Sequence, residues 1–121
     1  DDIVVLASNK DELHSLLHEI RAYLRNRLKL KVKRNYQVFP VDSRGIDFLG
    51  YRFYHTHTLL RKSIKRKFCR RVAKLRKKKH VKYEHFKQQI CSWWGWCKYC
   101  DSNNFMNKIL KDLPYEIKFK R

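Results

Sequence analysis

The chain has 121 residues and a mass of 14.9 kDa, which fits one domain or two small units. Its 30 Lys and Arg against 11 Asp and Glu give a formal net charge of +19 at pH 7. A hydrophobic content of 43% and an aromatic content of 14% suffice for a core, which excludes a wholly disordered basic tail. No apolar run approaches the roughly 20 residues of a membrane span, so we expect no membrane-spanning segment.

The first 57 residues combine strand patterns with one helix. Residues 3–7 form a short apolar, β-branched run that predicts a buried strand. Residues 10–27 repeat apolar side chains every three or four positions, which predicts an amphipathic helix capped by Ser8-Asn9. A turn is expected at 42–45. Further strands are expected at 28–32, 36–41 and 46–54, the last with a close backbone approach at Gly50.

Past residue 58 the apolar period changes from 2 to 3.6, which predicts helices. The first, at roughly 60–79, has an apolar stripe of Leu60, Ile64, Phe68, Val72 and Leu75. Two more are expected at 83–97 and 105–113, followed by a basic tail at 115–121 that forms a strand or is disordered. We therefore expect an α+β chain, in which an α/β part (1–57) precedes a basic three-helix part (58–121).

Most of the charge lies in one segment, because residues 59–83 contain thirteen Lys or Arg and no acid. A field of this sign attracts polyanions, so nucleic acid is the first candidate partner. An anionic membrane surface, an acidic protein, or a solvated face without a partner are the alternatives. The residues expected to bind nucleic acid are Arg61, Lys62, Lys65, Arg66, Lys67, Arg70, Arg71, Lys74, Arg76, Lys77 and Lys78.

The cysteines and histidines predict no metal site. Cys97-x-x-Cys100 has a zinc-like spacing, but no second ligand pair follows, so we expect both thiols to fill the core. His14 and His18 lie four residues apart without a third ligand, which favours an exposed helix face. From the start of the sequence we expect no secretory leader, and therefore reduced thiols in the cytoplasm.

Three tryptophans at 93, 94 and 96 must face different sides of one helix. At least one of them is therefore expected at the surface, where it could stack on bases. The others are expected to pack in the core.

Several motifs, taken in chain order, resemble the C-terminal part of a bacterial retroelement-type reverse transcriptase. This group includes the enzymes of group II introns, retrons and diversity-generating retroelements. The motifs are Asp1-Asp2 before an apolar strand, the runs 30–35 and 45–53, Ser92-Trp93-Trp94-Gly95-Trp96 and Asp101-Ser102-Asn103. The diversity-generating enzymes are the most similar, through the run 37–47, and the resemblance spans residues 1–113.

The resemblance implies a catalytic role for the N-terminal acids. Asp1 and Asp2 resemble the end of the Tyr-x-Asp-Asp motif, which binds the two Mg²⁺ ions of nucleotidyl transfer together with an Asp on an earlier strand. That earlier Asp and the fingers would lie upstream, so we expect this fragment to be inactive alone and to hold no Mg²⁺. A flexible acidic terminus is the alternative for the pair.

The resemblance also assigns binding roles. Lys33 or Arg34 would contact the nucleotide triphosphate, with a solvated strand face as the alternative. Phe48, Leu49 and Gly50 would form the primer grip. Residues 1–57 would be the C-terminal part of the palm, and residues 58–121 the thumb, whose basic helix would lie along the RNA template/DNA primer duplex.

Two hypotheses on function remain. The first is the reverse-transcriptase fragment, whose partners would include the upstream fingers and palm of the same polypeptide. An accessory protein or self-association through unpaired strand edges would be a further partner. The second is a stand-alone basic RNA- or DNA-binding module without catalysis. The sequence upstream of Asp1 distinguishes them, because the first requires a Tyr-x pair and about 200 further residues there.

Overall fold

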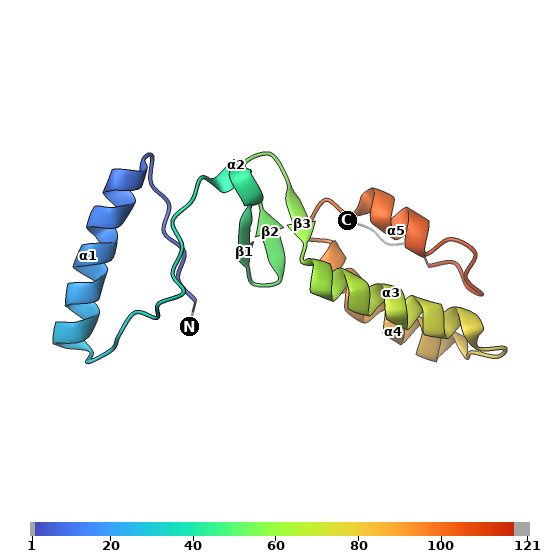
Figure 1. Cartoon of the computed structure of the whole chain (residues 1–121). Coiled ribbons are helices and arrows are strands. Elements are labelled where there is room, and N and C mark those ends of the chain that lie inside the picture. The colour runs from blue at the N-terminus through green and yellow to red at the C-terminus, as the bar shows by residue number, and fades with distance from the viewer. Residues whose placement is uncertain (1, 118–121) are drawn as a thin grey trace. The chain divides into compact units, whose positions relative to one another are not determined.

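The computed structural model describes residues 2–117 and confirms the α+β class (Figure 1). The described part contains five helices and one three-stranded antiparallel sheet with strand order β1-β2-β3. The elements are α1 (Lys10–Arg27), α2 (Val41–Arg44), β1 (Ile46–Phe48), β2 (Tyr51–Phe53), β3 (Thr58–Leu60), α3 (Lys62–Lys77), α4 (Tyr83–Cys97) and α5 (Asn103–Ile109). The chain divides into unit 1 (Asp1–Arg44) and unit 2 (Gly45–Arg121). The division into palm and thumb at residue 57 stays a prediction.

Helix α1 of unit 1 begins and ends where the sequence predicts. Asn9 is the N-cap, and its side-chain oxygen accepts a hydrogen bond of 2.8 Å from the backbone N–H of Glu12. Asp11 and Glu12 lie in the first turn, where acids stabilise the helix dipole. At the other end, the N–H of Leu28 donates to the carbonyl of Leu24, and the helix stops there.

The strands expected in unit 1 are not formed. Residues 3–7, 28–32 and 36–41 have no strand structure, and Ile3 and Leu6 are 72% and 70% exposed. No described residue of unit 1 is buried, and the apolar stripe of α1 is only half-covered. These predictions were wrong because β-propensity acts through cross-strand packing, and residues 2–44 offer these segments no pairing strand. The expected turn at 42–45 overlaps the one-turn helix α2, which begins at Val41.

The strand expected at 46–54 is instead a hairpin. Leu49 and Gly50 have φ values of 53° and 88°, so both central residues meet the positive-φ requirement of a type I′ turn. The turn pairs Phe48 with Tyr51, and β3 then pairs Leu60 with Tyr51. Leu60 therefore belongs to the sheet, and the basic helix begins at Lys62 rather than at residue 60.

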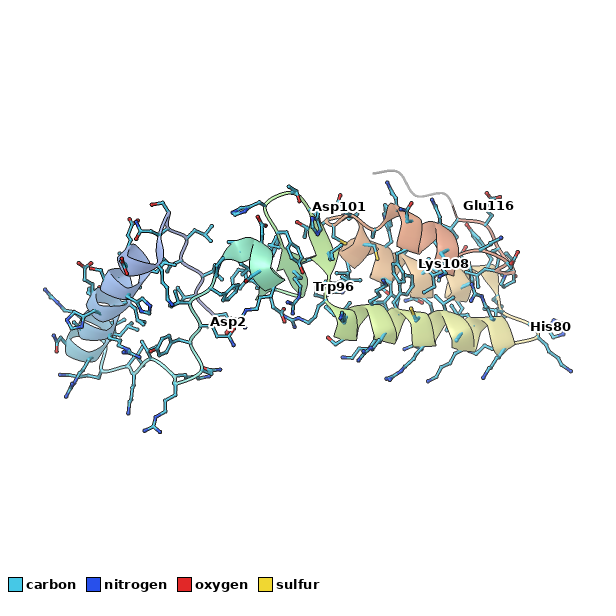
Figure 2. The ribbon with its side chains drawn as sticks, turned by 45° about the horizontal axis from the view of Figure 1, so that its top comes forward. Asp2, His80, Trp96, Asp101, Lys108 and Glu116 are labelled. Carbon is cyan, nitrogen blue, oxygen red and sulfur yellow. The ribbon has the colours of Figure 1, made fainter. Side chains whose placement is uncertain are left out.

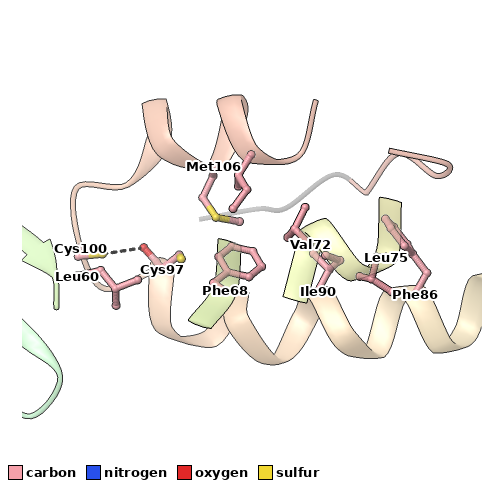
Figure 3. Packing of buried hydrophobic residues seen from close by; sticks show 10 residues of the cluster. Leu60, Phe68, Val72, Leu75, Phe86, Ile90, Cys97, Cys100 and Met106 are labelled. Atoms are coloured by element: carbon pink, nitrogen blue, oxygen red, sulfur yellow. Dashed lines mark hydrogen bonds between the residues drawn. The ribbon is translucent and has the colours of Figure 1, made fainter. Parts of the chain in front are cut away.

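The core of unit 2 lies between its helices. Phe68, Val72 and Leu75 of α3 are at most 2% exposed, and they pack with Phe86 and Ile90 of α4 (Figure 3). Leu60, Cys97, Cys100, Met106 and Ile109 complete the buried cluster. Cys97 and Cys100 are 0% and 7% exposed in this cluster, which confirms that the pair fills the core.

The predicted stripe of α3 is confirmed from Ile64 to Leu75, whereas its first member, Leu60, lies in β3. The bounds of α4 are confirmed. α5 is shorter than expected, since it ends at Ile109 rather than near residue 113. The chain then turns through Asp112, which has a φ of 58°. Residues 115–117 form no strand, and the rest of the predicted tail, 118–121, lies outside the described residues, as does Asp1.

Candidate nucleic-acid interface

The surface of α3 is almost entirely cationic. The helix has 16 residues, and nine of them are Lys or Arg with no acid among them. At 1.5 Å per residue it is about 24 Å long. Because its apolar residues recur every three or four positions, one side contacts the core, and the cations cover the remaining surface (Figure 2).

Eight cations form what we call the basic face. Its residues are Lys62, Arg66, Lys67, Arg70, Arg71, Lys74, Lys77 and Lys78. All eight side chains are exposed, and no residue between 2 and 117 forms an ion pair with them. Helical geometry places Lys62, Arg66 and Arg70 in one row opposite the core, since they are four residues apart. The basic face therefore presents uncompensated positive charge along the length of α3.

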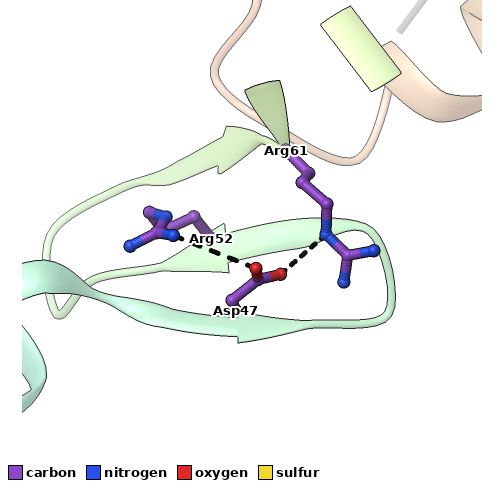
Figure 4. A network of polar contacts seen from close by, with 3 residues as sticks. All are labelled: Asp47, Arg52 and Arg61. Carbon is purple, nitrogen blue, oxygen red and sulfur yellow. Dashed lines mark hydrogen bonds and ion pairs between the residues drawn. The ribbon is translucent and has the colours of Figure 1, made fainter. Parts of the chain in front are cut away.

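Three other residues predicted to bind nucleic acid already contact protein groups. The Nε of Arg61 donates to the Oδ1 of Asp47 at 2.7 Å, and Arg52 approaches the other carboxylate oxygen at 3.9 Å (Figure 4). The guanidinium of Arg76 donates to the carbonyls of Ile109 and Lys111. These contacts attach α3 to the sheet and to the end of α5.

Lys65 is the third of these residues. Its ammonium nitrogen lies 4.7 Å from the centroid of the Phe105 ring, a cation–π geometry. The sequence could not separate these three cations from the basic face, because their partners are 14 to 40 positions away in the chain. Their binding to nucleic acid stays a prediction.

The hairpin turn packs tightly against α3 and α4. A Cβ on Gly50 would lie 2.4 Å from Cζ3 of Trp96 and 2.9 Å from Cδ1 of Ile64. The carbonyl of Gly50 also accepts the backbone N–H of Arg61 at 2.9 Å. The close approach expected at Gly50 is therefore made by protein side chains at the first turn of α3 and the last turn of α4. Leu49 beside it is 68% exposed.

A second connection joins the sheet to the loop after α4. The backbone N–H of Thr58 donates to the carboxylate of Asp101 at 2.9 Å, and the N–H of Asp101 donates to the carbonyl of Thr58 at 2.8 Å. The Tyr51 hydroxyl donates to the Trp96 carbonyl at 2.7 Å. Burial, with smaller contributions from Cys100, Cys97 and Tyr99, raises the pKa of this phenol, which keeps it a donor. Sequence reasoning missed both connections, because no local pattern marks them.

The predicted catalytic residues are not assembled into a site by the described part of the chain. Asp1 lies outside it, and Asp2 is exposed in unit 1 outside any helix or strand. Lys33 and Arg34 are also exposed in unit 1. Residues 2–117 contain no group of three or more His, Cys, Asp or Glu that could hold a metal ion. The role of Asp1 and Asp2 in binding Mg²⁺ stays a prediction, and we assign no catalytic step to the described residues.

No protein-family model matches the chain, and no curated protein shows significant similarity to it. Among the described helices, none is both long and apolar enough to cross a bilayer.

Proposed function

We propose that the chain binds a nucleic-acid duplex through the basic face of α3. The observation that carries this proposal is the basic face: eight exposed cations along a helix of about 24 Å and at its C-cap, with no acid in the helix to neutralise them. Lys and Arg contacts to phosphates give affinity without sequence preference. A duplex read by shape and backbone, such as an RNA–DNA hybrid of near A-form, suits this surface.

The wider proposal is that the chain is the C-terminal part of an RNA-directed DNA polymerase. Its support is the ordered resemblance of the motifs and the position of α3 directly after the strand region that contains Phe48, Leu49 and Gly50. In the parent enzyme, residues 1–57 would complete the palm and residues 58–121 would form the thumb on the template/primer duplex. Asp1 and Asp2 would bind Mg²⁺ together with an upstream carboxylate, and the enzyme would act in the cytoplasm.

The alternative is a stand-alone basic module that binds RNA or DNA without catalysis. It is favoured by the core of unit 2, which is formed without any residue of unit 1. Primer extension distinguishes the two hypotheses. The parent polypeptide should incorporate nucleotides with Mg²⁺ on a primed RNA, whereas this chain alone should not. A parent without incorporation would favour the module.

A salt titration of binding tests the common part of both hypotheses. Fluorescence anisotropy with a labelled RNA–DNA hybrid should show the affinity falling by about 10³- to 10⁵-fold between about 50 and 200 mM salt, if six to ten cations contact phosphates. A flat titration would refute binding through the basic face.

A further inference from the structure

Two aromatic side chains lie at the surface where α4 ends. Trp96 is 38% exposed and Tyr99 is 68% exposed, whereas Trp93 and Trp94 pack against the core. The backbone N–H of Tyr99 donates to the carbonyl of Trp96, so the two residues occupy successive turns. Figure 2 shows Trp96 between the sheet and the first turn of α3.

The ring of Trp96 is held in place by the hairpin. Its six-membered ring fills the space that the missing side chain of Gly50 leaves open. The Tyr51 ring packs beside it, with centroids 5.8 Å apart and an interplanar angle of 45°. The hydrogen bond from the Tyr51 hydroxyl to the Trp96 carbonyl fixes the backbone below. A ligand would therefore meet an ordered aromatic surface, with little conformational entropy left to lose.

One cation lies against this surface, and the basic face begins nearby. The ammonium nitrogen of Lys98 lies 4.9 Å from the centroid of the Tyr99 ring. The neighbouring acid Asp101 accepts a hydrogen bond from the backbone of Thr58. The backbone N–H of Arg61 donates to the carbonyl of Gly50, and the basic face begins at the next residue, Lys62. Cations beside exposed aromatic rings match an anionic strand that carries bases better than an apolar protein surface.

We propose that Trp96 and Tyr99 form a stacking platform for unpaired bases of a single strand that extends from a duplex on the basic face. This inference rests on the proposed function, because the duplex would deliver the strand to the start of α3. Stacking is tolerant of sequence, since every base has a π-face. The platform would thus recognise the junction between duplex and single strand, rather than a particular sequence.

The test compares a blunt RNA–DNA hybrid with the same hybrid carrying a short single-stranded extension. Binding of the full chain is measured by fluorescence anisotropy at one salt concentration. One stacked base should tighten binding by roughly 5- to 150-fold, so we expect the extended hybrid to bind at least about fivefold tighter. Tyr99→Ala should abolish most of this gain without weakening binding of the blunt hybrid.

Controls separate stacking from loss of structure. Tyr99 is largely exposed, so Tyr99→Ala should have the same thermal midpoint as the unaltered chain. Trp96→Phe keeps an aromatic ring and should retain part of the gain in affinity for the extended hybrid. Tyr23 is 60% exposed on α1 and serves as the matched control, since Tyr23→Ala should leave the gain unchanged.

Three outcomes would overturn the platform alone. The first is equal affinity of the unaltered chain for blunt and extended hybrids, which leaves the duplex proposal standing. The second is a full gain in Tyr99→Ala. The third combines two results: the extended hybrid binds no more tightly than the blunt one, and light scattering detects self-association of the chain that Tyr99→Ala abolishes. That result would assign the surface to protein contacts. Binding of neither hybrid would overturn both proposals.

Discussion

Neutralising part of the basic face should lower the salt dependence of binding by a calculable amount. If all eight cations contact phosphates, the slope of log K against log salt is about −7, and affinity falls about 10⁴-fold between about 50 and 200 mM salt. The double substitution Arg66→Gln and Arg70→Gln removes two contacts. The slope should therefore change to about −5, and the fall in affinity should decrease to about 10³-fold. Anisotropy titrations with the RNA–DNA hybrid measure both quantities.

The matched control has the same net charge. Arg25→Gln with Arg27→Gln removes two cations from the last turn of α1, outside the proposed interface, and should leave the slope near −7. Arg66 and Arg70 repel one another at a spacing of four residues, at a cost of about 0.2–0.5 kcal/mol, so their removal should not lower the thermal midpoint. Equal changes of slope in the two double variants would mean that binding responds only to net charge, which would refute a role specific to α3.

Three further predictions concern the contacts that hold unit 2 together. Leu49→Asn should raise the free energy of unfolding in urea by about 0.5–1 kcal/mol, because Asn tolerates positive φ. Gly50→Ala should lower this free energy by about 2 kcal/mol, because the added Cβ would meet Trp96. Arg76→Gln should lower the free energy of unfolding by about 1–2 kcal/mol through two lost hydrogen bonds. Arg70→Gln removes no hydrogen bond to a described residue and should change this free energy by less than about 0.5 kcal/mol, so equal losses would contradict the prediction. Because the pKa of Tyr51 is raised in the folded state, its phenol ionises at a lower pH in the unfolded chain than in the folded one. The free energy of unfolding should therefore fall as the pH rises above about 10, and Tyr51→Phe should lack this contribution to the fall.

The helices could be predicted from the sequence because their determinants are local. The Asn9 cap, the acids of the first turn and the apolar spacing all lie within α1 itself. The stripe of Phe68, Val72 and Leu75 likewise identifies the inward side of α3 before any partner is known. The position of the basic face follows from that stripe, since the cations occupy what remains of the helix surface.

The strands could not be predicted in the same way, because a strand needs a partner that its own residues do not specify. The apolar run at 3–7 has strand composition but no neighbour to pair with among residues 2–44. The hairpin was missed because Leu49 is an unusual residue for a type I′ turn, which Asn and Gly favour. Similarly, the contacts of Arg61 and Arg76 depend on residues far away in the chain, so composition alone counted both as ligands for phosphate.

The charge of α3 exceeds what folding requires. Arg61 and Arg76 anchor the helix, and the cations of its last turn complement its dipole. The remaining cations oppose stability, since the first turn has no acid, and Lys62, Arg66 and Arg70 form a repelling row. A helix that served only to cover the core would lose this repulsion through interspersed Glu. A bound polyanion would neutralise these cations and so remove the repulsion. Because the polyanion would bind the folded state alone, the residues that destabilise the free chain would stabilise the complex.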